Sequence, residues 1–441
     1  MACALVCKAW LVCGLALLYE DTKLLIDAHI QPPRLASPSD RLYKIGKALA
    51  QGELRQPTFV RSMSIVGDYE CHKHEGKSIN ILSAPLATRT ALWRDSEGAQ
   101  QLLMCVHEQS RASSQGTYAV SCRRVAPHVM DLQIESQANG PLLAFARATS
   151  LHNVAFPALR ELDLHLMSSS RDERAPSNFD LGTLLRHFRN TCQHLTLSFK
   201  VADSRQNRPF VWTHEDWCFA NLTRLRLVEP PLAIQRAALK ASMASLTTLQ
   251  YDFSPILGRK STLSHLVANL VAVFKDAADV PHVESLRLKL PLMFKAVTVP
   301  ASEPQDTIHA VSELLQQLPV LRELKLVLKH TLNNISVTPA LLLAPSSLRS
   351  LELAWDAPGW FKSGATELLP LSRSLDDLIS ALQVGELDWL QTLTLRDCAD
   401  PMGDMNPNVL GPSVRTLRQL CQDLEITFTA SEHLLATDTQ A

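Results

Sequence analysis

The chain has 441 residues, of which 46% are hydrophobic and 20% are charged, so it can bury a large core and is not a disordered tail. Its 43 Lys and Arg residues nearly balance 44 Asp and Glu residues, which excludes a global basic field for nucleic acid or an anionic membrane and leaves only local patches. With 15 glycines, a turn-rich all-β fold and Gly-rich phosphate loops are both disfavoured.

The first patterned segment is a short apolar run at 11–19. It differs from a secretion signal, because no charged region precedes it and Glu20 and Asp21 follow where a small-residue cleavage site would lie. No stretch offers the roughly 18 apolar residues that a membrane span needs. The ten cysteines are scattered without a C-x-x-C pair, which indicates reduced thiols. We therefore expect a protein of the cytoplasm or nucleus that does not enter a membrane.

From residue 60 onward the pattern L-x-x-L-x-L recurs about eleven times, with aliphatic substitutions. Its second and third apolar positions alternate with other residues, which predicts a strand with one buried face. A degenerate further copy is expected around Gln101–Gln109. The copies are Val60-Met63-Ile65, Val129-Leu132-Ile134, Leu159-Leu162-Leu164, Cys192-Leu195-Leu197, Leu222-Leu225-Leu227, Leu246-Leu249-Tyr251, Val283-Leu286-Leu288, Leu321-Leu324-Leu326, Leu348-Leu351-Leu353, Leu390-Leu393-Leu395 and Cys421-Leu424-Ile426.

Segments with helical spacing of apolar residues lie between these copies. The clearest are 181–188, 263–270, 311–318 and 375–382. Polar or Pro-rich stretches at Ser168–Asn178, Val299–Pro304 and Pro401–Pro412 are expected to be loops.

Recurring strand–helix units favour an α/β leucine-rich-repeat solenoid, in which a curved parallel sheet carries outer helices. A doubly wound sheet also alternates strand and helix and is the alternative. The first step between copies is 69 residues, between Met63 and Leu132. The later steps vary from 24 residues, between Leu225 and Leu249, to 42, between Leu351 and Leu393, so we expect an irregular array. The repeats are expected over 58–429, followed by a frayed tail over 430–441.

The N-terminal residues carry a second pattern, Leu5-Val6-Cys7-Lys8-Ala9-Trp10 followed by Leu17-Leu18-Tyr19. This resembles the second half of an F-box. With a helix expected at Arg41–Leu54 and a repeat strand following it, the chain resembles fungal F-box proteins with degenerate leucine-rich repeats. The F-box-like helical segment, residues 1–57, is expected to be truncated at its N-terminus, because the leucine-proline helix that opens an F-box does not precede it.

In that family the F-box docks on Skp1, and through it on a cullin ubiquitin ligase, while the repeats hold a substrate. The resemblance therefore implies a substrate-recruiting adaptor, with Leu5, Val6, Cys7 and Trp10 as its Skp1-docking residues. The alternative for these four residues is the core of a helical cap on the first repeat. The alternative function is a repeat scaffold that binds a protein partner without a link to Skp1 or ubiquitin.

No catalytic motif is complete in the sequence. Gly76-Lys77-Ser78 ends like a P-loop, but the first glycine of that motif would fall on Cys71. The Cys71–His74 cluster lacks a second ligand pair at zinc-finger spacing. His214-Glu215-Asp216 lacks a second anchored partner and indicates a polar loop. We therefore expect no enzyme activity, no cofactor and no metal site.

Residues between the buried leucines are expected on the concave face of the sheet, which repeat proteins commonly use for binding. The middle repeats are basic there, whereas both ends lean acidic, with Asp423 and Glu425 assigned to the last copy. Because arginine suits bidentate contact with carboxylate or phosphate, we hypothesise that this strip holds an acidic or phosphorylated segment of a partner. The alternative is a solvated face with partly paired charges. The predicted partner-binding residues are Arg224, Arg226, Arg287, Lys289 and Lys325.

Overall fold

The computed structural model describes fourteen stretches of the chain, which form two compact units divided between Leu222 and Thr223. Both units combine a mainly parallel sheet with helices, so the α/β class predicted from the sequence is confirmed. The F-box-like segment, with Leu5, Val6, Cys7 and Trp10, lies outside the described residues. The described residues are 62–67, 89–94, 100–105, 129–136, 155–168, 179–201, 210–213, 217–253, 262–276, 281–290, 302–329, 336–356, 369–397 and 407–430.

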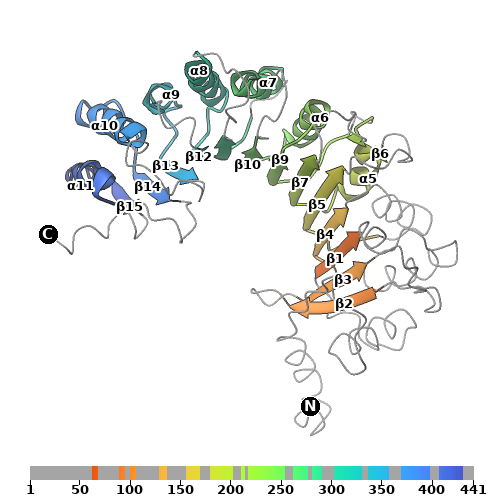
Figure 1. The fold of residues 1–441 in the computed structure, drawn as a ribbon. Helices are drawn as coiled ribbons and strands as arrows, with labels where there is room; N and C mark the ends of the chain where they lie inside the picture. The colour runs from red at the N-terminus through yellow and green to blue at the C-terminus, as the bar shows by residue number, and fades with distance from the viewer. Residues whose placement is uncertain are drawn as a thin grey trace, which may run out of the picture. The chain divides into compact units, whose positions relative to one another are not determined.

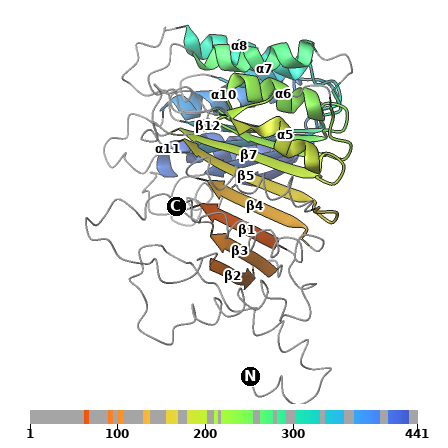
Figure 2. The same cartoon turned by 90° about the vertical axis from the view of Figure 1, so that its right-hand side faces the viewer.

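The first unit is built on a sheet with the strand order β7-β5-β4-β1-β3-β2, part of which Figure 2 shows in succession. All neighbours are parallel except β2 and β3. A separate two-stranded pair, β6 with β8, flanks a short helix. The elements are β1 (Ser62–Gly67), β2 (Arg89–Arg94), β3 (Gln100–Cys105), β4 (Asp131–Ser136), β5 (Glu161–Ser168), β6 (Phe179–Asp180), α5 (Leu181–Leu185), η6 (Arg186–Phe188), β7 (His194–Val201) and β8 (Phe210–Val211).

The degenerate copy expected around residue 101 is a strand, β3, with Leu102 in register with Met63 of β1. Its place in the sheet differs from a simple repeat order, because β1 pairs with β4 on one side and with β3 on the other. The intervening β2 runs antiparallel at the edge, as a hairpin-like partner of β3. Sequential stacking of strands therefore begins with β4.

The second unit is a parallel sheet in which the strands follow one another in chain order from β9 to β15. Figure 1 shows helices α7 to α11 as a layer on the outer side of these strands. The elements are β9 (Arg224–Val228), α6 (Leu232–Ser242), β10 (Thr248–Asp252), α7 (Leu263–Lys275), β11 (Ser285–Leu290), α8 (Glu303–Gln316), β12 (Glu323–Lys329), α9 (Thr338–Leu342), β13 (Ser350–Asp356), α10 (Leu369–Gln383), β14 (Thr392–Asp397), α11 (Pro407–Asp423) and β15 (Thr427–Ala430).

The repeated leucines form two ladders across this sheet, at successive positions of one face. Each ladder side chain is at most 3% exposed, and burying one leucine contributes about 1.5–3 kcal/mol. The first ladder is Leu225, Leu249, Leu286, Leu324, Leu351 and Leu393, and the second is Leu227, Tyr251, Leu288, Leu326, Leu353 and Leu395. The predicted strand register is thus confirmed from β9 to β14.

A second repeating feature lies just before each strand, where one carbonyl oxygen accepts hydrogen bonds from two successive N–H groups of the next repeat. Thr223 O accepts from Thr247 N and Thr248 N, at 3.0 and 2.9 Å, and Thr247 O accepts likewise from the residues that open β11. The same pair of bonds recurs at the entries of β12, β13 and β14. Repeats of very different length therefore meet the sheet through one backbone arrangement.

All four helices predicted from apolar spacing are present. In addition, α8 begins, and α11 lies partly, in segments that were predicted to be loops. Pro304 lies in the first turn of α8 and Pro407 opens α11, although both were assigned to loops. Proline is well tolerated in the first turn, where its missing N–H has no intrahelical partner. The loop prediction for these two segments therefore extended too far.

The last repeat was placed wrongly by the sequence pattern. Strand β15 begins at Thr427, with Phe428 in register with Leu393, and not at the predicted position around Leu424. Residues 421–423 instead end α11, and in the turn that follows, Ile426 N donates to Cys421 O at 2.7 Å. Asp423 and Glu425 consequently belong to a helix end and not to the sheet face.

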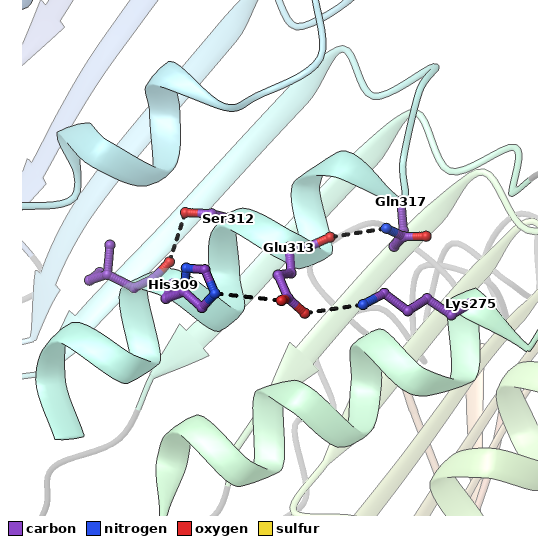
Figure 3. A network of polar contacts seen from close by, with 6 residues as sticks. Lys275, His309, Ser312, Glu313 and Gln317 are labelled. Carbon is purple, nitrogen blue, oxygen red and sulfur yellow. Dashed lines mark hydrogen bonds and ion pairs between the residues drawn. The ribbon is translucent and has the colours of Figure 1, made fainter. Parts of the chain in front are cut away.

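The outer helices also contact one another through polar groups (Figure 3). Glu313 of α8 accepts from Lys275 of α7 at 3.2 Å and lies 3.5 Å from His309 on its own helix. Such exposed pairs contribute roughly 0–1 kcal/mol, so the leucine ladders dominate the stability of this layer. Among the described helices, none is long and apolar enough to cross a membrane.

Candidate binding face of the second unit

The candidate site is the face of the β9–β15 sheet opposite the leucine ladders, called here the open face. Alternation along each strand places polar residues on it, and parallel pairing aligns them across strands. Its central row, in register from β9 to β14, is Arg226, Gln250, Arg287, Lys325, Glu352 and Thr394. All five predicted partner-binding residues lie on this face, from β9 to β12.

At one end of the row, Arg226 pairs with Asp252 of the neighbouring strand. Its Nη2 atom donates to Oδ2 at 3.1 Å. The carboxylate side chain is only 9% exposed, and both Asp252 Oδ1 and Arg226 Nε are buried without a hydrogen-bond partner. The pair is thus held by one bond and does not use its full hydrogen-bonding capacity.

At the other end, Glu352 joins cations of two neighbouring strands. Its Oε1 atom accepts from Lys325 Nζ and lies 3.0 Å from Arg396 Nε. Glu352 and Lys325 side chains are 20% and 25% exposed, and nearby positions on the same face, Val327 and Ala354, are buried. The Glu352 carboxylate therefore interacts with two cationic side chains, and partial burial shields these groups from water.

Strand β11 lies between these two networks and carries Arg287 and Lys289. Lys289 is in register with Asp252, whereas Arg287 is in register with Gln250 and Lys325. The Nε atom of Arg287 is buried without a hydrogen-bond partner, and no ion pair joins Arg287 to an acid among the described residues. A cation with no described counter-ion therefore lies at the centre of the row.

The open face has an excess of positive charge. Among the described strand side chains from β9 to β14, six are basic and three acidic, so the balance is +3. The bases are Arg224, Arg226, Arg287, Lys289, Lys325 and Arg396, and the acids are Asp252, Glu323 and Glu352. The residues of the predicted basic strip therefore lie on one face of the sheet. Acidic side chains neutralise part of their charge, as expected for a solvated face with partly paired charges.

The first unit carries a different pattern on the corresponding strand positions. Glu161 and Asp163 of β5 lie on the face opposite the buried Leu162 and Leu164, and Glu161 Oε1 is 2.6 Å from His194 Nδ1 on β7. The prediction of an acidic N-terminal end is thus confirmed at these strands. At the C-terminal end it is wrong, because the two acids assigned to β15 belong to the end of α11.

The other candidates from the sequence contribute no described site. Trp212 and Trp217, which flank the 214–216 cluster, are buried and stacked with ring centroids 5.5 Å apart, whereas the cluster lies outside the described residues, as do 71–78. Within the described stretches, no group of three His, Cys, Asp or Glu side chains is arranged to hold a metal ion.

Comparison of the sequence with models of known protein families gives no match, and comparison with curated proteins gives none either.

Proposed function

We propose that this chain is a non-enzymatic protein-interaction module, a leucine-rich-repeat solenoid that binds a protein partner on the open face of its second unit. The observation that carries the proposal is the aligned polar row on β9–β14 opposite two complete leucine ladders. Stacked repeats commonly bind partners on such a strand face, because it presents one side chain per repeat at regular spacing.

Within this proposal, we favour a substrate-recruiting adaptor of a Skp1–cullin ubiquitin ligase acting in the cytoplasm or nucleus. Its support is the resemblance of residues 5–19 to the second half of an F-box. The alternative is a scaffold that binds its partner without Skp1 or ubiquitin. Copurification of the full chain with Skp1 separates the two: retention supports the adaptor, and absence of retention by folded chain leaves the scaffold.

The binding face itself is tested by site-specific photo-crosslinking in cells. A benzoylphenylalanine at Gln250, on the open face, should form a discrete covalent adduct with the partner. The matched position is Arg236, which is exposed on α6 of the same unit. Adducts from Arg236 with none from Gln250 would contradict binding at the open face.

A further inference from the structure

Arg287 is the cation of the central row that makes no described ion pair, and the fold does not explain the position of its guanidinium group. It lies on β11 between the Arg226–Asp252 pair and the Glu352 network, and its Nε atom is buried without an acceptor. A buried donor without a partner costs free energy that a hydrogen bond would recover. The Nε atom itself is enclosed, so an incoming acceptor would contact the terminal Nη atoms of this partly exposed side chain, which are not among the buried unpaired atoms.

The acids of the face are already engaged elsewhere. Asp252 Oδ2 accepts from Arg226, and Glu352 Oε1 is shared between Lys325 and Arg396. Glu323, the remaining acid, is in register with Ser285, two residues before Arg287 on the strand, and is exposed. Among the described residues it makes no ion pair with Arg287, so the chain supplies no internal counter-ion there.

From this arrangement we infer that Arg287 receives a carboxylate of an acidic segment of the protein partner, with Lys289 and Lys325 alongside it. The inference depends on the proposed function, since it names the chemistry of the partner at the same face. An arginine fork can bind both oxygens of a carboxylate at once, which fixes the orientation of the group as well as attracting it.

The charge of the site favours a carboxylate over a phosphate. A phosphate monoester carries about −1.5 to −2 charges and gains most from a cluster of unpaired cations. Here Lys325 and Arg226 already pair with acids, which leaves Arg287 as the cation of the central row without a described counter-ion. A group with a single negative charge matches this one cation of the central row.

The probe is a fluorescent peptide of about twelve residues with alternating glutamate and serine, titrated with the full chain at low ionic strength, where exposed charges are least screened. Fluorescence anisotropy should show binding that is lost in a peptide with glutamine in place of glutamate. Arg287→Gln should weaken binding roughly tenfold or more, the loss expected for one charge-assisted contact. Arg236→Gln, with the same charge change on α6, should leave binding unchanged.

Three results would overturn the inference: no binding of the glutamate peptide, equal loss in both variants, or tighter binding of a phosphoserine peptide or a single-stranded oligonucleotide of equal charge. Thermal unfolding of Arg287→Gln shows whether the variant is folded, and Arg287→Lys, which keeps the charge but lacks the fork, should give an intermediate loss. If the peptide titration fails while crosslinked adducts still form at Gln250, the acidic partner is rejected and the binding face is retained. If the peptide titration and the crosslinking both fail, the proposed function is rejected as well.

Discussion

At the scale of single residues, Asp180 shows how local polar contacts hold the first unit together. Its Oδ1 accepts from Gly182 N at 3.0 Å and Thr213 N at 3.1 Å, and its Oδ2 accepts from the hydroxyls of Thr183 and Thr213. Asp180 thereby caps α5 and ties it to the segment after β8, two elements far apart in the sequence. Partial burial alone would raise the pKa of this carboxyl, but the hydrogen bonds outweigh it and lower the pKa.

Because the folded-state pKa is lowered, the contribution of Asp180 is present above the unfolded pKa, near 3.8, and is lost as pH falls through the folded value. Asp180→Asn should therefore cost about 1–2 kcal/mol at neutral pH, and the gap to wild type should close in acid. Urea unfolding of both proteins at pH 7 and near pH 3 measures the loss of stability and its dependence on pH. Asp388→Asn, in the exposed turn after α10, is the control; an equal loss in it, or a gap independent of pH, would contradict this role.

The described cysteines differ sharply in environment. Cys192 and Cys421 occupy the first apolar position of two predicted repeat copies and are buried, whereas Cys218 is exposed. Burial raises the pKa of the Cys192 thiol to about 12 and that of Cys421 to about 11. Because the thiolate is the reactive form, both should be inert in the folded chain.

Brief alkylation with iodoacetamide at pH 8, followed by peptide mass spectrometry, should label Cys218 and leave Cys192 and Cys421 unmodified. In urea all three should react alike. Rapid native labelling of Cys192 would contradict its buried position just before β7.

At the scale of elements, helices α10 and α11 end in the same backbone motif but with different residues. Gly385 follows α10 with a φ of 76°, and Glu425 follows α11 with a φ of 59°. In both, the next N–H returns to a carbonyl five residues back, at 3.0 Å for Glu386 to Ala381. This is a Schellman ending, whose left-handed position favours glycine.

The two positions therefore predict opposite effects. Gly385→Ala should destabilise the chain by about 1 kcal/mol, although no atom lies within 4 Å of the added Cβ, because an L side chain is strained at this φ. Glu425→Gly should stabilise it by a few tenths to about 1 kcal/mol. Chemical unfolding of both variants gives the comparison, and a destabilised Glu425→Gly would refute the assignment of the motif.

Adjacent residues of β11 provide a test of strand alternation. Leu288 is fully buried on the ladder side, and Arg287 points to the open face. Leu288→Ala should cost about 2–5 kcal/mol, whereas Arg287→Ala should cost under about 1 kcal/mol because the guanidinium has no described ion-pair partner to lose. The midpoints of urea unfolding report both. Similar losses would mean that the two faces are not distinct.

At the scale of the whole molecule, the strands that carry the leucine ladders, β9 to β14, were readily predicted from the sequence. Each ladder position repeats one local pattern, and that pattern is the one that burial of a strand face requires. The helix starts at Pro304 and Pro407 were missed since a proline in the first turn resembles a loop signal. The error at β15 arose because Cys421, Leu424 and Ile426 fit the strand pattern while belonging to a helix end.

The candidate site was predicted less completely than the fold. Alternation placed Arg226, Arg287 and Lys325 on one face, but pairing across strands depends on register between segments tens of residues apart. The sharing of Glu352 between Lys325 and Arg396, and the absence of a described acid for Arg287, emerge only when the strands are aligned. No local sequence signal distinguishes Arg287, which has no described ion pair, from Arg226, which pairs with Asp252.

The most direct test of the central claim, that the open face of the second unit is the binding surface, is a hydrogen-exchange footprint of the full chain with and without its crosslink-identified partner. Binding should slow amide exchange in peptides that cover β10, β11 and β12 and leave α6, α7 and α8 unchanged. Slowed exchange confined to the helices, with the strands unaffected, would contradict the claim.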